Sequence, residues 1–421
     1  MPMDFQFYER KVYIEDEQWE RYVTYYEEVA KQVYFSDVTT YDKGSMLGWM
    51  DLDFYANKDR LVEIEEFGAS IREHYDALVI SGVGGSIQAT LAVLSCLGMN
   101  QMPTYYIGYT MSTRAIQKVI TQLNGKRVYL INIAKNFETL EPGIGFRIMT
   151  DYLCKTTESY ANHVSVIGTP NSKLHALAKQ EGFRFWPFYE EIGGRFSGFS
   201  DVSLLPLAIN GVSISSFITG AKTLQERYRT ISLAENASYQ YAIARNALYK
   251  EGKAIEIFAS FDSHFEHLLK WCVQLFAESE GKELKGLFPA RANYSEDLHA
   301  IGQYVQDGQR NIIETFLHVR EESHHLCIPA NGLHDGFTYI EGKSLKEIND
   351  KAFEATIAAH HDAKVPCFIV TVDTLDEHHL GQLFYFFMTA CYMSAVLLEV
   401  NPFNQDGVEA YKDYMFTSLG K

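Results

Sequence analysis

The chain has 421 residues, of which 47 % are hydrophobic and 14 % aromatic, so it is long enough for two or three domains and lacks the composition of a disordered protein. Its 37 Lys and Arg against 54 Asp and Glu give a net charge of −17, which argues against nucleic acid or an anionic membrane as a general partner. This charge does not exclude a small anionic ligand, because such a ligand needs only a local positive pocket.

Targeting and redox signals point to the cytoplasm. The N-terminal segment is charged throughout, without the apolar core of a secretory signal, and no window has the roughly 18 uninterrupted apolar residues of a membrane span. The six cysteines are scattered, with no C-x-x-C pair, which is typical of reduced thiols. We therefore expect a soluble, cytoplasmic protein.

The elements in the first half of the chain alternate regularly. Residues 1–45 are polar and aromatic-rich and predict an N-terminal helical arm on the outside of a domain. From 46 to 205, short apolar runs alternate with helical patterns, the first of which covers 86–98. This alternation predicts an α/β domain with a parallel sheet and helices on both faces. The predicted strands are 76–82, 103–108, 127–133, 164–168 and 183–188.

The second half of the chain repeats this organisation. Residues 206–252 predict a helical connection with few breakers. Residues 253–421 predict a second α/β domain that ends in an apolar helix over 380–398. The strands predicted in this domain are 253–260, 325–330 and 367–372.

Glycines follow the first predicted strand directly, in the segment SGVGGS at 81–86. Glycines there let the backbone approach a ligand closely, and the N-terminus of the next helix then faces that ligand. The segment does not match the G-x-G-x-x-G nucleotide fingerprint, because neither Gln88 nor its neighbours supply the third glycine. An anion site and a tight turn that only packs are both compatible with it.

A polar turn over 134–139 joins the predicted strand 127–133 to a helix. Unpaired backbone N–H groups and the helix dipole favour an anion at such a turn. However, the turn has few hydroxyl groups and contains the carboxylate of Glu138. Taken alone, these residues do not decide between a phosphate site and a simple turn.

Four residues have side chains suited to moving protons on a carbon skeleton. Arg195 lies in GGRFSG and is suited to stabilising a developing negative charge, and Glu278 ends an apolar helical segment whose partial shielding from water suits a general base. His299 lies within a helical pattern, and Lys412 follows Glu409 by one turn. Taken alone, each of them is better explained by an ordinary structural or surface role.

Three histidine doublets, at 324–325, 360–361 and 378–379, raise the question of a metal site. Adjacent residues do not face the same way on a helix or a strand, and no Cys or carboxylate spacing accompanies them. We predict no metal site.

The order of the motifs along the chain resembles the glucose-6-phosphate isomerase family, in its shorter bacterial branch. The resemblance covers nearly nine-tenths of the chain, from about residue 47 to the end. The segments that carry it are GVGGS, AKNFETLEP, GGRFS, QLFAESEGK, DLHAIGQYVQDG and FNQDGVEAYK.

The resemblance implies two sugar-isomerase (SIS) domains and a homodimer whose active site draws residues from both subunits. It also implies reversible conversion of glucose 6-phosphate to fructose 6-phosphate, without a metal, nucleotide or other cofactor. Carried over by position, Glu278 moves the proton between C1 and C2, and Arg195, beside Gly194, stabilises the cis-enediolate. His299 of the other subunit and Lys412 serve ring opening. The further residues expected to bind the sugar phosphate are Gly85, Ser86, Lys135, Asn136, Thr139, Glu141, Gln274 and Gln405.

The turn over 134–139 departs from the family pattern, which resembles S-K-[ST]-x-T-T-x-E. Ala134 stands in place of the serine, Asn136 in place of the next hydroxyl residue, and Glu138 in place of a threonine. A carboxylate about 4 Å from a phosphate costs on the order of 4 kcal/mol per charge pair at an effective dielectric near 20. We therefore expect Glu138 to point outward and the phosphate grip to be weakened but not abolished.

Two alternatives to a working glucose-6-phosphate isomerase remain open at this point. The altered turn is compatible with a catalytically inactive relative that only binds a sugar phosphate. It is also compatible with an isomerase for a different sugar that has less charge at its far end. Retention of Glu278, His299, Arg195 and Lys412 together favours an enzyme.

Overall fold

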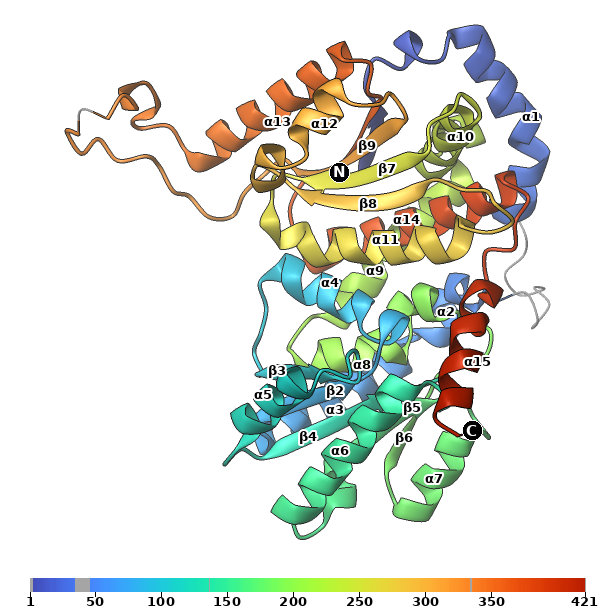
Figure 1. Ribbon diagram of the computed structural model, residues 1–421, viewed down its shortest axis with the longest axis vertical. Coiled ribbons are helices and arrows are strands. Elements are labelled where there is room, and N and C mark those ends of the chain that lie inside the picture. Colours follow the sequence, from blue (N-terminus) through green and yellow to red (C-terminus); the bar gives the residue numbers. More distant parts are fainter. Residues whose placement is uncertain (1–2, 35–45, 136, 334, 421) are drawn as a thin grey trace. The chain divides into compact units, whose positions relative to one another are not determined.

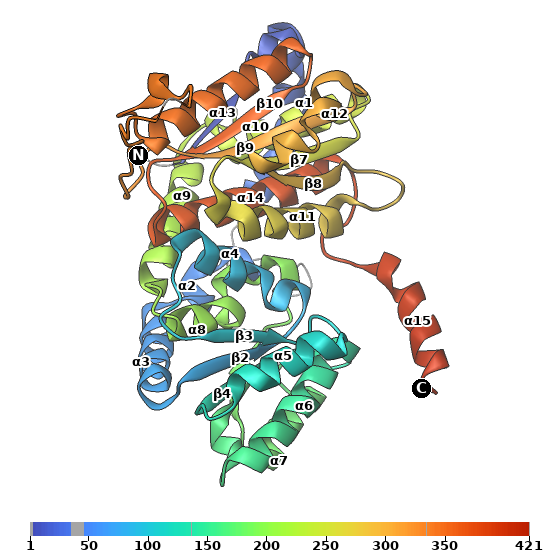
Figure 2. The same cartoon turned by 60° about the vertical axis from the view of Figure 1, so that its left-hand side comes forward.

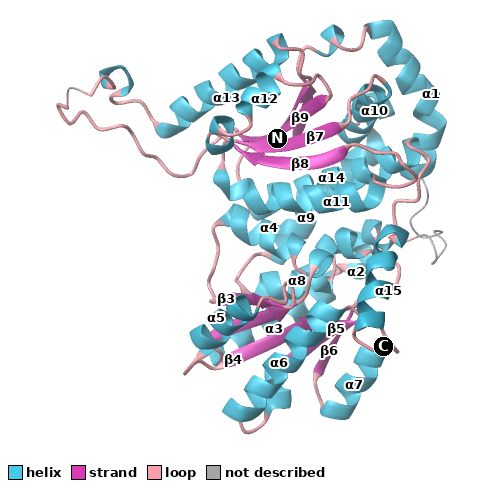
Figure 3. Cartoon of the chain, in the orientation of Figure 1, coloured by secondary structure: helices cyan, strands magenta, loops and turns pink. Residues whose placement is uncertain are grey.

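The computed structural model describes residues 3–34, 46–135, 137–333 and 335–420. The chain divides into two compact units, which we name by their continuity in the sequence. The continuous unit is Ser36–Thr223, and the discontinuous unit combines Met1–Phe35 with Leu224–Lys421. Each contains one five-stranded sheet with helices on both faces (Figures 1 and 3), so the α/β class predicted from the sequence is confirmed.

The sheet of the continuous unit is entirely parallel. Its central strands are buried from end to end because their runs of Val, Leu and Ile are covered on both faces. Every strand predicted in this unit is present. In spatial order the strands are β3 (Thr104–Ile107), β2 (Ala77–Ser81), β4 (Val128–Ile133), β5 (Val164–Gly168) and β6 (Arg184–Pro187).

Helices cover both faces of this sheet. Apolar side chains of α5 (Thr113–Leu123), α6 (Leu140–Thr156) and α7 (Lys173–Glu181) join one face in a single core. On the other face, Phe67 of α3 (Lys58–His74) packs on Tyr129 and Trp186. The remaining helices are α2 (Leu52–Tyr55), α4 (Gln88–Leu97), α8 (Asp201–Ile209) and α9 (Ile214–Thr230), within which the two units divide.

The sheet of the discontinuous unit is parallel except for one edge. The N-terminal strand β1 pairs antiparallel with β10 and so brings the start of the chain into the sheet formed by its second half. In spatial order the strands are β1 (Asp4–Phe7), β10 (Cys367–Val372), β9 (Ile312–Val319), β7 (Ile255–Ser260) and β8 (Phe288–Asn293).

Two helical layers enclose this sheet, with α12 and α13 on one face and α11 and α14 on the other (Figure 2). Helix α14 is long and apolar enough to span a membrane, but 89 % of its apolar window is buried inside the protein, as in a core helix. The helices are α1 (Asp16–Tyr34), α10 (Ala237–Lys250), α11 (Glu266–Glu280), α12 (Gly302–Asp307), α13 (Leu345–Asp362), α14 (Glu377–Leu397) and α15 (Glu409–Ser418).

The structure and the predictions differ in several strands. The strand predicted over 325–330 is wrong. This segment lies in the loop between β9 and α13, and among the described residues of that loop β-bridge pairing is limited to one isolated bridge, from Cys327 to Ser344. Strands β8 and β9 were not predicted. Within the segment predicted as a helical arm, 1–45, residues Asp4–Phe7 form strand β1 of a sheet and Asp16–Tyr34 form α1, and residues 35–45 lie outside the described residues.

Candidate active site

In the continuous unit, the predicted residues gather at the carboxyl ends of the strands. The glycine segment follows β2, the polar turn follows β4, and the segment with Arg195 follows β6. Because the strands are parallel, all three segments lie at the same edge of the sheet. Ligands of open α/β sheets bind outside this edge.

Two glycines bring the glycine segment against the arginine segment. A Cβ atom on Gly85 would lie 2.2 Å from the carbonyl carbon of Gly194, so only glycine permits this approach. The hydroxyl oxygen of Ser197 lies 2.7 Å from the Gly194 carbonyl oxygen and 3.2 Å from that of Gly85, and it thus bridges the two segments. Ser86 lies half-buried at the end of the glycine turn.

Arg195 is a buried cation. Only 2 % of the residue is exposed, and its guanidinium carbon lies 5.8 Å from the centre of the Phe196 ring. A cation shielded from water attracts an anion more strongly than an exposed one does. Arg195 is therefore suited to the charge-stabilising role predicted for it.

Lys135 connects the polar turn to the arginine segment. Its Nζ donates to the carbonyl oxygens of Glu190 and Ile192, at 2.9 Å each, and lies 5.4 Å from the Phe188 ring centre. Burial lowers the pKa of Lys135. Its ammonium group thus supports the backbone just before Gly193.

The polar turn is anchored by its aromatic residue. Phe137 has a left-handed backbone, with φ at 50°, and its ring packs edge-on against Phe146 of α6 at 5.8 Å. Thr139 occupies the N-cap of α6 and is exposed, and its hydroxyl group makes no capping hydrogen bond. Glu141 lies half-buried in the first turn of α6, and Asn136 lies outside the described residues.

Glu138 forms an ion pair in the structure. Its Oε1 accepts a hydrogen bond from Lys173 Nζ, at the start of α7, at 3.0 Å, and its side chain is 58 % exposed. The carboxylate is therefore partly neutralised by a cation of its own unit. The sequence did not point to Lys173, because it lies 35 positions away in the chain.

In the discontinuous unit, two predicted residues, Gln274 and Gln405, contact a third, Glu278. Gln274, one turn earlier on α11, donates to Glu278 Oε1 at 3.1 Å, and Gln405 donates to Glu278 Oε2 at 3.2 Å. Both carboxylate oxygens thus accept a hydrogen bond from a neutral amide. These two hydrogen bonds orient the carboxylate between the amides of Gln274 and Gln405.

Lys412 and His299 are not joined to this group by any contact that the structure describes. Lys412 Nζ lies 2.7 Å from Glu409 Oε1 on α15, which follows the short turn begun by Gln405. His299 is exposed at the end of a single helical turn, Glu296–His299, that follows β8.

The strand topology separates His299 from Glu278 within one chain. Helix α11 is the crossover between the parallel strands β7 and β8, so its C-terminal end, with Glu278, leads into the start of β8. His299 follows the end of β8. A strand of six residues spans about 20 Å, at about 3.3 Å per residue, which is far beyond hydrogen-bond reach.

Comparisons with known proteins give one consistent result. The family model for phosphoglucose isomerase matches residues 64–416. The chain is 40 % identical over 390 residues to a glucose-6-phosphate isomerase of Shouchella clausii, covering 89 % of this chain and 86 % of that protein. It is 39 % identical to the enzyme of the same name from Exiguobacterium sibiricum, covering 89 % of this chain and 87 % of that protein.

Solved structures share the fold. A hypothetical protein from Thermus thermophilus matches with a TM-score of 0.89 at 24 % identity, covering 96 % of this chain and 97 % of that chain. A glucose-6-phosphate isomerase from Chlamydia trachomatis matches with a TM-score of 0.81 at 16 % identity, covering 99 % of this chain and 88 % of that chain.

Proposed function

The chain belongs to the phosphoglucose isomerase family and is an isomerase, and on this premise we propose that it interconverts D-glucose 6-phosphate and D-fructose 6-phosphate in the cytoplasm, without a cofactor. The observation that carries the proposal is the Glu278 carboxylate held between the amides of Gln274 and Gln405. A carboxylate fixed by neutral donors is suited to collect a proton from one carbon and return it to the next.

The proposed reaction needs one base and one cation. Glu278 removes the proton from C2 of the open-chain aldose, and the electron pair of the C–H bond forms the double bond of a cis-enediolate. Arg195 stabilises its negative charge. Glu278 then returns the proton to C1. The hydroxyl proton moves from O2 to O1, which gives the ketose with its carbonyl group at C2.

At the phosphate end, we propose binding by backbone N–H groups and by the N-terminus of α6, with Ser86, Asn136 and Thr139 as side-chain donors and Gly85 and Glu141 beside them. Support comes from the ion pair between Glu138 and Lys173, because a carboxylate with its own cation repels a phosphate less than an unpaired one does. In this proposal Lys135 supports the turn through the backbone of 190–192.

We further propose that the working enzyme is a homodimer with shared sites. Support comes from the strand topology: within one chain β8 separates His299 from Glu278, and a partner subunit could supply the histidine proposed for ring opening. Histidine suits this task because it exchanges protons near neutral pH. Lys412 is the second group proposed for ring opening.

The substitution Glu278→Gln tests this assignment. It keeps the side chain's size but removes the base, so we expect turnover of fructose 6-phosphate to fall at least about a thousandfold, at the upper range of general-base contributions. Exchange of the C2 proton of glucose 6-phosphate with solvent deuterium, followed by NMR, should be lost as well.

The matched control is Glu266→Gln at the other end of α11. The Glu266 side chain is 47 % exposed, and its Oε1 lies 3.6 Å from Arg291 Nη1. We expect it to retain turnover. Wild-type protein that is stabilised against heat by glucose 6-phosphate but never converts it would reject the enzyme in favour of a sugar-phosphate-binding relative. Conversion of another sugar in preference to these two would reject the proposed substrate.

A further inference from the structure

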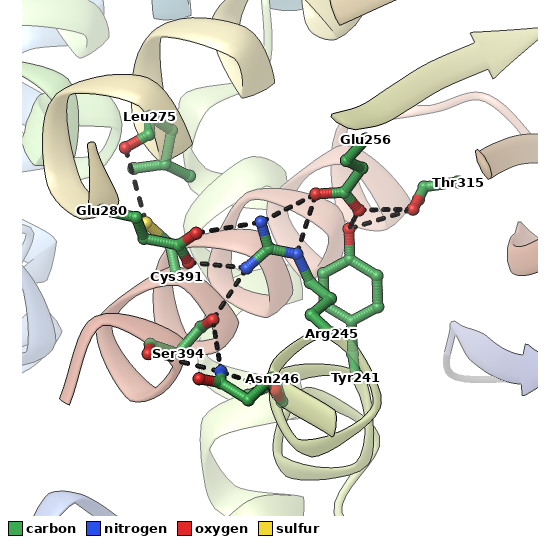
Figure 4. Close-up of polar contacts among 10 residues, drawn as sticks. Tyr241, Arg245, Asn246, Glu256, Leu275, Glu280, Thr315, Cys391 and Ser394 are labelled. Carbon is green, nitrogen blue, oxygen red and sulfur yellow. Dashed lines mark hydrogen bonds and ion pairs between the residues drawn. The ribbon is translucent and has the colours of Figure 1, made fainter. Parts of the chain in front are cut away.

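A charged group is fully buried in the discontinuous unit, outside the residues assigned above. Arg245 of α10 is 1 % exposed, and its guanidinium group lies between the carboxylates of Glu256 on β7 and Glu280 on α11 (Figure 4). Neither carboxylate side chain is exposed. The sequence singles out only Glu256, the one charged residue of the strand IEIFAS, because α10 and α11 each carry other charged residues as well.

Four hydrogen bonds and one further ion-pair contact surround the guanidinium group. Towards Glu256, Nε and Nη2 lie 2.8 Å and 2.7 Å from Oε2. Towards Glu280, Nη1 lies 2.6 Å from Oε1 and Nη2 lies 3.0 Å from Oε2. The fifth contact, at 2.7 Å, joins Nη1 to Ser394 Oγ on α14. Only the planar fork of arginine satisfies these positions at once.

Burial makes this group costly in free energy. Two carboxylates face one guanidinium group, and burial raises the pKa of Glu280 although Arg245 opposes that change. Buried ion pairs often contribute no more stability than apolar side chains of the same volume. The ion pairs of Arg245 are therefore better explained by the fixed positions that they impose on Glu256 and Glu280 than by a gain in stability.

That geometry concerns the last turn of α11. Glu280 is the last residue of the helix, and the Phe276 ring, one turn earlier, lies 4.2 Å from the Arg245 guanidinium carbon. The loop after the helix packs closely on Glu280. A Cβ atom on Gly286 would lie only 2.6 Å from the Glu280 carbonyl oxygen, so this approach needs a glycine. Arg245 therefore contacts this turn through both a carboxylate and a ring.

The helix transmits this restraint to Glu278. Residues two positions apart point about 200° apart around an α-helix, at 3.6 residues per turn. Because Arg245 holds Glu280 on the inner face of α11, Glu278 lies on the opposite face of this helix. Gln274 lies four residues before Glu278 and shares that face.

We propose that Arg245 is a positioning residue for the reaction: by holding Glu280 and Phe276, it fixes the last turn of α11 and the direction of the Glu278 carboxylate. The inference rests on the proposed function, because the direction of Glu278 matters only if this carboxylate is the base. A base displaced by about 1 Å can slow a reaction by up to about a hundredfold while substrate binding persists.

The test is Arg245→Lys, which keeps the charge but removes the fork. We expect kcat for fructose 6-phosphate to fall at least tenfold, with KM within twofold of the wild-type value, because no substrate contact is removed. Hydrogen exchange followed by mass spectrometry should show faster exchange of the amides over 277–281, and unchanged exchange in α13.

The matched control is Arg310→Lys. Arg310 donates to the carbonyl oxygens of Gly308 and Ala363, next to α12 and α13, and none of these contacts involves α11. We expect its kcat to stay within twofold of wild type. Equal loss of kcat in both variants, or a folded Arg245→Lys variant with wild-type kcat, would overturn the inference.

A milder variant covers the case in which Arg245→Lys does not fold. Ser394→Ala removes the Oγ atom that accepts hydrogen bonds from Arg245 Nη1 and from Asn246 Nδ2. We expect kcat to fall at least threefold at constant KM, and an unchanged kcat overturns the inference. Wild-type protein without isomerase turnover rejects the proposed function instead, and the exchange of 277–281 in the variants then decides whether Arg245 holds this turn.

Discussion

Glu278 and Glu280 have the same side chain and lie two positions apart, yet they occupy opposite environments. Glu278 is half-buried and accepts hydrogen bonds from two neutral amides, whereas Glu280 is fully buried against a guanidinium group. The segment FAESEGK does not itself distinguish the two. The difference arises because Arg245 reaches α11 from another helix.

Glu138 offers a prediction at the residue scale. In Lys173→Met the carboxylate loses its ion pair with Lys173, so we expect KM for glucose 6-phosphate to rise about two- to fivefold, in line with a surface ion pair worth up to about 1 kcal/mol. Glu138→Thr, which removes the carboxylate and adds a hydroxyl group, should lower KM.

Steady-state kinetics at low and high salt check this prediction, because screening should reduce the effect of Lys173→Met. Lys179→Met, an exposed lysine on the same helix, is the control and should leave KM unchanged. If both lysine variants raise KM equally, the effect belongs to the net charge of the unit and not to the pair with Glu138.

At the element scale, the site depends on segments that end strands or helices. In the continuous unit, the glycine segment, the polar turn and the arginine segment follow β2, β4 and β6. The parallel sheet aligns these segments, and Gly85, Gly194 and Ser197 then join two of them. A loop can hold a ligand group only if the loops beside it fix its backbone.

Gly85→Ala tests this loop contact. Its methyl group would overlap the Gly194 backbone, at 2.2 Å, so the loops must separate and Arg195 must shift. We expect kcat/KM to fall at least about a hundredfold, as for a displaced catalytic group. In Gly193→Ala the nearest atom would lie at 3.6 Å, an ordinary contact, so this variant should stay near wild type.

Crystal structures of both variants and their kcat/KM values check the contrast. Equal activity of the two variants would show that the approach of Gly85 to Gly194 is not needed for catalysis. A loss in Gly193→Ala alone would show that the steric argument points to the wrong glycine.

At the scale of the whole molecule, burial of histidines links stability to pH. Burial lowers the pKa values of His175, His267, His318 and His378, although Asp350 partly opposes the shift at His318. A histidine with a lowered pKa in the folded state binds protons more readily once the chain unfolds. The free energy of unfolding therefore falls as the pH falls below about 6.5, the ordinary histidine pKa.

We expect the melting temperature to decrease between pH 7 and pH 5, a window above the ordinary range of carboxylates. His318 stacks on Phe353 with ring centres 4.5 Å apart, so His318→Gln should reduce this decrease. His74→Gln, at an exposed position on α3, should not. Differential scanning calorimetry across this window measures the effect, and a melting temperature that is flat or rises towards pH 5 would contradict it.

The amino-acid sequence determined the local features of the protein. Apolar runs of five or six residues that end in glycine or polar turns specify strands such as β2 and β4, since such runs are stable only when buried on both faces. The motif order indicated the family, and the comparisons confirm it. The sequence failed at β8, whose exposed and buried residues do not alternate as in a regular strand, and at 325–330, where a short apolar run lies outside the sheet.

Only the tertiary structure decided which distant residues meet. The pairing of β1 with β10, of Glu138 with Lys173 and of Arg245 with Glu256 and Glu280 joins positions that no local pattern relates. Periodicity reports which residues are buried, because burial depends on the face of one element. The partner of a buried charge depends on how several elements pack, and this information is present only in the folded chain.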